Sequence, residues 1–340
     1  MYKFKILNII AIFILLITAI SCSNTDIKKS TEIKTVELMR FEQELFKCKT
    51  NNDFLNLRKK YPEFYQSFCT DILNIKPEFA DNNFIEALQS FLNHEGIKML
   101  KKDVDSVFKD VSDIEMELSL AQQNFEANFT GYRFPRFLTF LSEFTYANVS
   151  YDTLIGIGLD MYLGSDYPYY KTLQIDFPEF LVRKLRREYI AANAIKALGI
   201  GLFEHQLKEK RFLAFILFEG KIRYFVKQLL PSVHDSIVFG ITGQQLKWCK
   251  ENEPQMWAHY IERKLLFNTE VEKFMRYIND GPFTIADGVP QESAPGIGVY
   301  TGYRIIEEYV KKQKPKLQDL MENNNWEEIL KKSGYSPDNT

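Results

Sequence analysis

Apolar side chains recur at helical spacing along most of this chain, and that pattern limits it to a mainly helical fold. Ile114, Leu118, Ala121 and Phe125, for example, follow one another at intervals of three or four residues, which places them on one face of a helix. Residues 34–130 are therefore expected to form a compact helical part. Further helices are expected at residues 179–198, 210–230, 244–267, 269–278 and 298–312.

Proline, glycine and threonine set the expected ends of these helices. Pro178 suits the first turn of the helix at 179–198, and Gly199 stands where a helix-ending glycine is expected. Thr242 is a candidate N-cap for the helix that follows it.

The central stretch departs from the helical pattern. Residues 137–144 and 153–159 are short apolar runs typical of strands, and residues 146–152 are the expected turn between them. Gly156 and Gly158 permit a close approach of another backbone to the second run. We therefore expect a mainly α fold of the α+β class, a helical bundle with a small central antiparallel β-hairpin or sheet.

The first 22 residues direct the chain out of the cytoplasm and onto a membrane. A basic start is followed by an apolar run from Ile6 to Ile20, which is shorter than the about 20 apolar residues of a membrane span. The run ends in Ala19-Ile-Ser-Cys22, which resembles a bacterial lipobox and implies lipidation of Cys22. The alternative is an uncleaved anchor helix. The expected organisation is a signal peptide at 1–21, a lipidated tether at 22–33 and a folded domain at 34–340, divided into 34–130 and 131–340.

Charge and cysteine content narrow the possible partners and crosslinks. With 43 basic and 45 acidic residues the formal net charge is −2, so no global basic field favours nucleic acid. The mature chain retains Cys48, Cys69 and Cys249 besides Cys22. One disulfide between Cys48 and Cys69 is possible, and three buried thiols are the preferred interpretation.

Two segments carry a family resemblance: residues 296–310, GIGVYTGYRIIEEYV, and residues 159–170, LDMYLGSDYPYY. Together they resemble the gliding-motility lipoprotein GldB family of Bacteroidetes. The resemblance implies a non-catalytic binding or scaffold component of motility and secretion machinery, anchored in membrane lipid through Cys22 and surrounded by envelope protein partners. Ser23 is not acidic, which favours an outer-membrane lipoprotein with acyl chains such as palmitate, and the tether lacks an acidic surface-export cluster, which favours the periplasmic side.

That family in turn resembles predicted zinc peptidases, which implies a zincin-like metallopeptidase fold. Such a site needs two histidines one helical turn apart, with a glutamate between them as base. The helix at 181–198 offers Glu188 and Asn193 but no histidine, while Glu219 stands where a third ligand is expected. No two of the histidines are spaced i, i+4; they are His94, His205, His234 and His259. The expectation is a degenerate peptidase fold with no catalytic residue, no metal and no cofactor.

The remaining candidate for function is a binding cleft. The loop from Asp160 to Tyr170 combines acids, a glycine and tyrosines, a composition suited to recognition or to an aromatic lid over the strands. Arg304 is expected in the cleft or paired with Glu219 or Glu308. The candidate residues are Asp160, Asp166, Tyr167, Tyr169, Glu219, Tyr303 and Arg304. Two rival functions remain open, a hydrolase that uses Glu219 and this loop, and a lipoprotein that binds glycans or peptides on the tyrosines.

Overall fold

The computed structural model describes residues 35–76, 84–151, 153–172 and 177–337. The expected signal peptide and lipidated tether lie outside the described residues. The described residues belong to one folded unit. Within the described ranges, no helix combines the length and the apolar character that a membrane crossing requires.

The N-terminal part is helical, as predicted, but it also contributes one strand, β1 (Leu38–Arg40). Its α3 helix begins at a capping box, in which Thr50 and Asp53 satisfy each other's backbone N–H groups. The helices are α2 (Phe41–Leu45), α3 (Asn51–Lys60), α4 (Pro62–Ser67) with a π-helical turn (Phe68–Ile72), α5 (Ile85–Asn93), α6 (Glu95–Val107) and α7 (Ser112–Asn128).

The sheet has four strands in the order β1-β2-β4-β3, namely β1 with β2 (Arg136–Phe140), β4 (Leu154–Gly158) and β3 (Asn148–Tyr151). β1 and β4 both run parallel to β2, and only β3 is antiparallel to its neighbour β4. The predicted antiparallel pairing of the runs 137–144 and 153–159 is therefore wrong, because the strands they contain, β2 and β4, run parallel. The sheet is mixed, its antiparallel hairpin is formed by β3 and β4, and the expected turn at 146–152 contains strand β3. Parallel strands lie buried on both faces, which explains why their sequence shows no alternation of polar and apolar residues.

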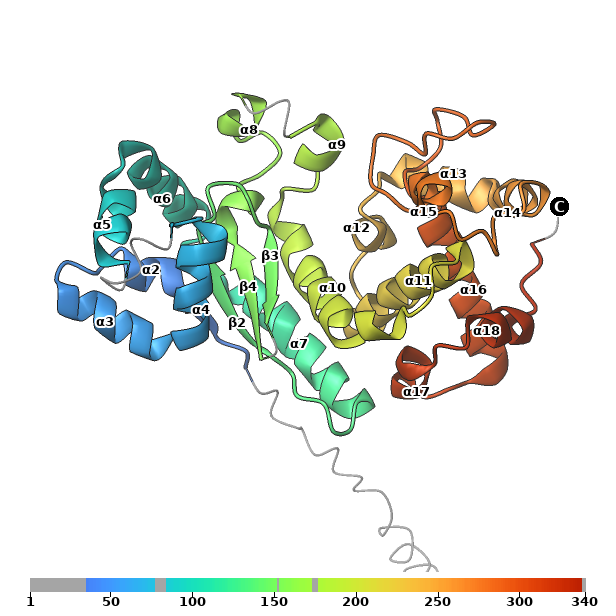
Figure 1. Ribbon diagram of the computed structural model, residues 1–340, viewed down its shortest axis with the longest axis horizontal. Coiled ribbons are helices and arrows are strands. Elements are labelled where there is room, and N and C mark those ends of the chain that lie inside the picture. Colours follow the sequence, from blue (N-terminus) through green and yellow to red (C-terminus); the bar gives the residue numbers. More distant parts are fainter. Residues whose placement is uncertain (1–34, 77–83, 152, 173–176, 338–340) are drawn as a thin grey trace, which may run out of the picture. The chain divides into compact units, whose positions relative to one another are not determined.

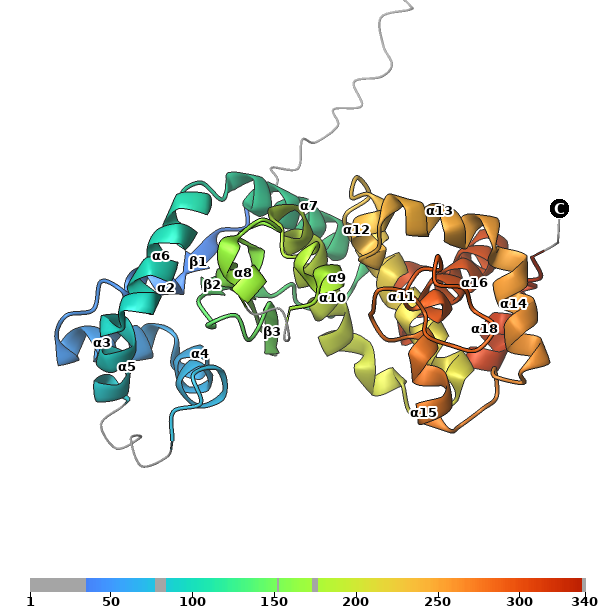
Figure 2. The ribbon, with the colours of Figure 1, turned by 90° about the horizontal axis from the view of Figure 1, so that it is seen from above.

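Helices cover both faces of this sheet (Figures 1 and 2). On one face Leu138, Phe140 and Leu154 pack against the apolar side chains of α2–α5. On the other, Phe137 and Ile155 join a larger core that includes α7 and the C-terminal helices. The helical N-terminal part and the central sheet thus share cores, because the strands have no polar face to turn toward water.

The C-terminal half is helical. Its two long central helices are α11 (Phe212–Leu229) and α16 (Ile297–Gln313), which pack closely against each other. The other helices are α8 (Pro168–Thr172), α9 (Glu179–Val182), α10 (Ile190–Phe203), α12 (Asp235–Phe239), α13 (Gly243–Glu251), α14 (Glu253–Glu262), α15 (Val271–Phe274), α17 (Leu317–Glu322) and α18 (Trp326–Ser333).

The predicted helix at 179–198 is wrong at both ends. The chain forms the short α9, then a 3-10 turn at Arg187–Tyr189, and only then α10, which continues through Gly199 to Phe203. Gly199 does not end the helix; a Cβ there would lie 2.9 Å from a ring carbon of Phe225 on α11. The glycine therefore serves the packing of α10 against α11. Thr242 does cap α13, with a capping box to Gln245.

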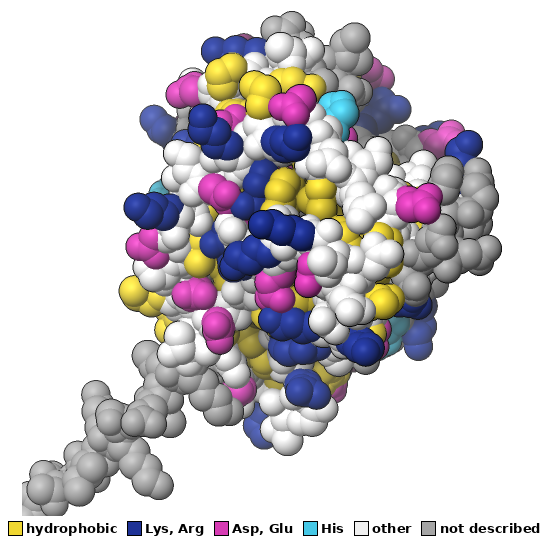
Figure 3. Space-filling view, turned by 90° about the vertical axis from the view of Figure 1, so that its left-hand side faces the viewer, with side chains coloured by type: hydrophobic (Ala, Val, Ile, Leu, Met, Phe, Trp, Pro, Cys, Tyr) yellow, Lys and Arg dark blue, Asp and Glu magenta, His cyan; other side chains and the backbone are white. Residues whose placement is uncertain are grey.

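The three described cysteines are free thiols, as the preferred interpretation held, although Cys48 is only half-buried. On the face formed by the N-terminal helices, basic and acidic side chains are interspersed (Figure 3). One example is the ion pair between Lys60 and Glu44, 2.7 Å long. This mixture agrees with the nearly balanced charge of the chain.

Candidate functional site

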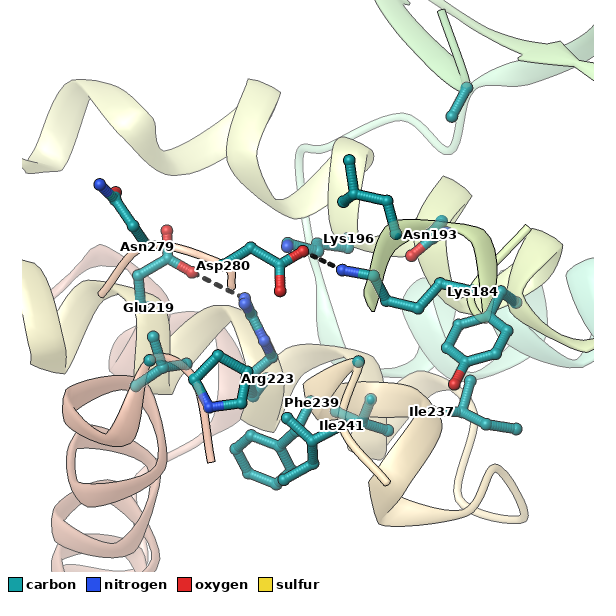
Figure 4. A pocket seen from close by; sticks show the side chains of 18 of the residues that line it. Lys184, Asn193, Lys196, Glu219, Arg223, Ile237, Phe239, Ile241, Asn279 and Asp280 are labelled. Atoms are coloured by element: carbon teal, nitrogen blue, oxygen red, sulfur yellow. Dashed lines mark hydrogen bonds and ion pairs between the residues drawn. The ribbon is translucent and has the colours of Figure 1, made fainter. Parts of the chain in front are cut away.

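A cavity of about 500 Å³ lies between α10, α11, α12 and the segment around residue 280. Its size falls in the range of about 300–1,000 Å³ that is usual for small-molecule sites. Most of its lining is apolar, with side chains such as Leu181, Leu185, Ile237 and Ile241. Five charged side chains point toward one another at one end (Figure 4); they are Lys184, Lys196, Glu219, Arg223 and Asp280.

Both carboxylates of the cavity are held by a cation. Arg223 Nη1 donates to Glu219 Oε2 at 2.7 Å, and both residues lie on α11 one turn apart. Lys184, which precedes α10, forms an ion pair with Asp280. Burial tends to raise the pKa of Glu219, but the positive charges of Arg223 and Lys196 outweigh that effect, so the pKa lies below its ordinary value. Glu219 is therefore ionised at neutral pH.

Lys196 faces these groups from α10. Repulsion by Arg223 and, second, burial lower its pKa to about 8, although Glu219 attracts the charged form. Its accessible surface is intermediate. Protein atoms surround the side chain, but the part that lines the cavity remains accessible. At pH 7 Lys196 is mostly protonated.

A short polar chain borders the charged end of the cavity. Asn193 Nδ2, also on α10, donates to the Tyr162 hydroxyl at 3.1 Å, and that hydroxyl donates to Asn148 Oδ1 at 2.9 Å. These contacts connect α10 to strand β3 and fix the orientation of the Asn193 amide. They leave the side-chain oxygen of Asn193, Oδ1, as a hydrogen-bond acceptor at the wall of the cavity.

The seven predicted cleft residues do not come together. Glu219 lines the cavity, whereas the other six are absent from its lining. Asp160 is fully buried and accepts hydrogen bonds from the backbone N–H groups of Ser142 (3.0 Å) and Phe144 (2.7 Å). Asp160 therefore holds the turn at 142–146 in place.

The tyrosine loop divides into packed and exposed side chains. Tyr167 donates to Asp103 on α6 at 2.8 Å, and Tyr169 is half exposed and stacks on Phe144. Asp166 is exposed. The tyrosines of this loop therefore pack partly against neighbouring segments, while Asp166 faces solvent.

Tyr303 and Arg304 lie on α16 and border a separate, shallower groove. Arg304 Nε lies 3.1 Å from the Glu253 carboxylate on α14, and Arg304 also pairs with Glu307. The expected pairing of Arg304 with Glu219 or Glu308 is therefore wrong. Glu253 also accepts from the Tyr335 hydroxyl at 2.9 Å, so this cluster ties α14, α16 and the C-terminal segment together.

Sequence reasoning missed Lys184, Lys196, Arg223 and Asp280. One signal was present: Asn193 and Lys196 are the polar residues of the otherwise apolar α10, and they are spaced i, i+3. Polar side chains at that spacing share a helix face. In a helix that is apolar all round, such a pair marks the side that faces a polar cavity.

The histidines are dispersed. His234 caps α12, and His259 forms a hydrogen bond of 2.8 Å with the Tyr277 hydroxyl. In the ranges that the structure describes, no three His, Cys, Asp or Glu side chains are grouped so as to hold a metal ion.

Comparison with known proteins adds the family. The family described as gliding motility protein GldB matches residues 22–337, which covers the cavity, the sheet and the tyrosine loop. No curated protein and no solved structure matches the chain. With nearly the whole chain matched, the protein belongs to the gliding motility protein GldB family.

Proposed function

We propose that the protein is a lipid-anchored envelope protein whose folded unit is a non-catalytic binding or scaffold component of gliding-motility machinery. The observation that carries this proposal is the extent of the family match, which begins at Cys22, the expected lipidation site, and runs to residue 337. A match that starts at this cysteine fits a mature chain whose first residue is Cys22. The proposed anchor lies in the outer membrane and holds the folded unit on the periplasmic side, among protein partners of the machinery.

The use of the cavity carboxylates supports a non-catalytic role. A general base must be free to accept a proton from a substrate, and a metal ligand must be free to coordinate. Glu219 and Asp280 are instead engaged by Arg223 and Lys184. Each carboxylate would have to lose its ion pair before it could accept a proton from a substrate or coordinate a metal.

A first prediction follows for the purified full-length protein. It should contain no stoichiometric zinc and should not hydrolyse a library of peptides, because the two carboxylates of the cavity are paired with cations and the histidines lie in separate elements. Metal analysis and mass spectrometry of the peptides measure both properties. Stoichiometric zinc together with peptide hydrolysis would overturn the proposal.

A second prediction concerns the anchor. Cys22→Ser should move the protein out of the acylated membrane fraction and abolish its recovery with envelope partners, because the acyl chains of a lipoprotein hold the chain stably at the membrane. Metabolic labelling with palmitate, fractionation and crosslinking in the native host measure the three effects. Cys48→Ser, at a half-buried thiol, is the control and should leave all three unchanged.

In Cys22→Ser, an uncleaved signal peptide could still hold the protein at the membrane, so a second variant is needed. In it, residues 1–22 are replaced by a signal peptide that is removed without lipidation. If this soluble periplasmic protein fully restores a deletion strain, the anchor is dispensable and the proposal fails.

A further inference from the structure

The proposed function leaves the ammonium group of Lys196 unused. Among the described residues, Lys196 Nζ makes no hydrogen bond or ion pair, and its interactions are longer-range ones with Arg223, Glu219, Lys184 and Asp280. An enclosed ammonium without a direct partner disfavours the folded state. A counter-ion that enters the cavity would remove that cost.

Arg223, which also lines the cavity, has an unsatisfied hydrogen-bond donor as well. Its residue is only 6% exposed, and while Nη1 holds Glu219, its Nε is buried with no hydrogen-bond acceptor among the described groups. Buried donors in native proteins are nearly always satisfied. Arg223, whose charge is the main repulsion acting on Lys196, therefore also has one donor without an acceptor.

The charges of the cavity also favour an anion. Its lining includes the cations Lys184, Lys196 and Arg223 and the carboxylates Glu219 and Asp280, so one positive charge is left when each carboxylate is paired with one cation. Cys249 is neutral at pH 7, since burial raises its pKa to about 12. Tyr162 and Tyr300 are also neutral, since burial raises the pKa of each hydroxyl. A single negative charge on a ligand would complete the balance.

The rest of the lining defines the body of the ligand. Apolar side chains surround the charged end; they include Met161, Leu181, Leu185, Ile237, Phe239 and Ile241. Sites with apolar walls and a few convergent polar groups bind small organic molecules. A fully hydrated inorganic anion would leave these walls uncovered.

We propose that the cavity binds a carboxylate with a compact apolar substituent, whose anionic head lies between Lys196 and Arg223 and whose apolar part packs on the aliphatic walls. The site does not depend on the proposed lipid anchor or on a motility role. Two sources share this chemistry: a free organic acid, and the C-terminal residue of a peptide. The Glu219–Arg223 ion pair keeps Arg223 oriented for this contact.

The test compares acids with amides of the same shape. Full-length protein in lipid nanodiscs is titrated calorimetrically with N-acetyl-leucine and with N-acetyl-leucinamide, and empty nanodiscs correct for partitioning. The acid should bind at least about tenfold more tightly than the amide, because a hydrogen bond to a charged group contributes roughly 1.5–3 kcal/mol. Equal affinity for acid and amide, or no binding of either, would overturn the proposal.

Two further ligands identify the source. If 4-methylpentanoate, a free acid, binds as tightly as N-acetyl-Ala-Ala-Leu with a free carboxylate, the site takes small organic acids. If the tripeptide acid binds more tightly than 4-methylpentanoate and than its own amide, the site takes peptide C-termini. Either result supports the proposal.

Lys196→Met is the decisive variant. It should weaken binding of N-acetyl-leucine about tenfold or more and at the same time raise the melting temperature, because the lowered pKa of Lys196 shows that the folded protein disfavours its charge. A loss of binding with a higher melting temperature cannot come from unfolding. Lys247→Met, at an exposed lysine of α13, is the control and should change neither. Unchanged acid binding in Lys196→Met contradicts the assignment.

The affinity should also depend on pH. The groups that face Lys196 are Arg223, Lys184, Glu219 and Asp280. The pKa of Glu219 lies below its ordinary value, so this carboxylate stays ionised above neutral pH. Affinity for N-acetyl-leucine should therefore fall as the pH rises through about 8, where Lys196 loses its proton. Lys196→Met should lose this dependence, and a dependence that persists in the variant contradicts the role of Lys196.

Discussion

Gly302→Ala should lower the free energy of unfolding by on the order of 3 kcal/mol, since it forces apart two closely packed helix backbones. A Cβ at Gly302 on α16 would lie 1.7 Å from the carbonyl oxygen of Ile216 on α11. Alanine favours an exposed helix by only about 1 kcal/mol over glycine, so the overlap decides the sign. Thermal and urea unfolding of the full-length protein, followed by helical circular dichroism, measure the change.

Gly243→Ala is the matched control. Gly243 begins α13, and a Cβ there would meet nothing within 4 Å. Its stability should stay within about 0.5 kcal/mol of the parent. If Gly302→Ala is equally harmless, the close packing of α11 on α16 is not present in solution.

Gly220 provides an internal check on this contact. A Cβ at Gly220 on α11 would lie 2.3 Å from the carbonyl carbon of Gly302, so the two glycines occupy the same crossing. Once either alanine has separated the helices, the other meets less resistance. The double variant should therefore be less destabilised than the sum of the two single ones.

Asp160→Ala should destabilise the protein by roughly 3–5 kcal/mol, because it leaves the buried N–H group of Ser142 and the partly buried N–H group of Phe144 without an acceptor. Both groups now donate to the Asp160 carboxylate. The turn they belong to is strained, with φ of 53° at Glu143 and 63° at Phe144, and the carboxylate holds it in that conformation. The same unfolding measurements apply, and a loss of partner binding without a loss of stability would contradict this structural role.

Asp166→Ala is the control from the same loop. Asp166 is exposed, so its removal should change stability by less than about 0.5 kcal/mol. The two variants therefore distinguish a buried structural acid, Asp160, from an exposed acid, Asp166, although both lie in the same loop.

The cost of losing Asp160 should also vary with pH. Burial raises the pKa of Asp160 to about 6, against hydrogen bonds from Phe144 and Ser142 that lower it. Between about pH 4, its unfolded pKa, and pH 6, the folded state holds more protons at this group than the unfolded state. The contribution of Asp160 to stability is therefore present at low pH and falls as the pH rises through this window. The difference in stability between the parent and Asp160→Ala should be larger at pH 4 than at pH 7.

The helices were predictable where the apolar pattern is long. Residues 210–230 and 298–312 correspond to α11 and α16 within two residues, since each helix buries a continuous stripe against the core. The Thr242 cap was predictable because a capping box uses only local groups. The sheet was not: β1 pairs with β2 at Leu38 and Phe137, and no local pattern encodes a partner about 100 residues away.

The partners of the charged residues were likewise not predictable from local sequence. Arg304 had acidic neighbours within one turn, yet it pairs with Glu253 from another helix as well as with Glu307. Asp160 stood in a loop rich in polar and aromatic residues, but it is buried beneath a turn. Whether a carboxylate is a ligand or a structural acceptor depends on which backbone groups face it.

The sequence by itself determined the helical character of the fold and the individual long helices, because these rest on residues that are close together along the chain. It also determined the family resemblance, which rests on several short segments in a set order. Only the tertiary structure decided the mixed sheet, the close glycine contact between α11 and α16, and the cavity in which Lys196 faces Arg223 and Glu219. Those features join elements that are distant in sequence. Their energies depend on distance and burial, which the order of residues does not state.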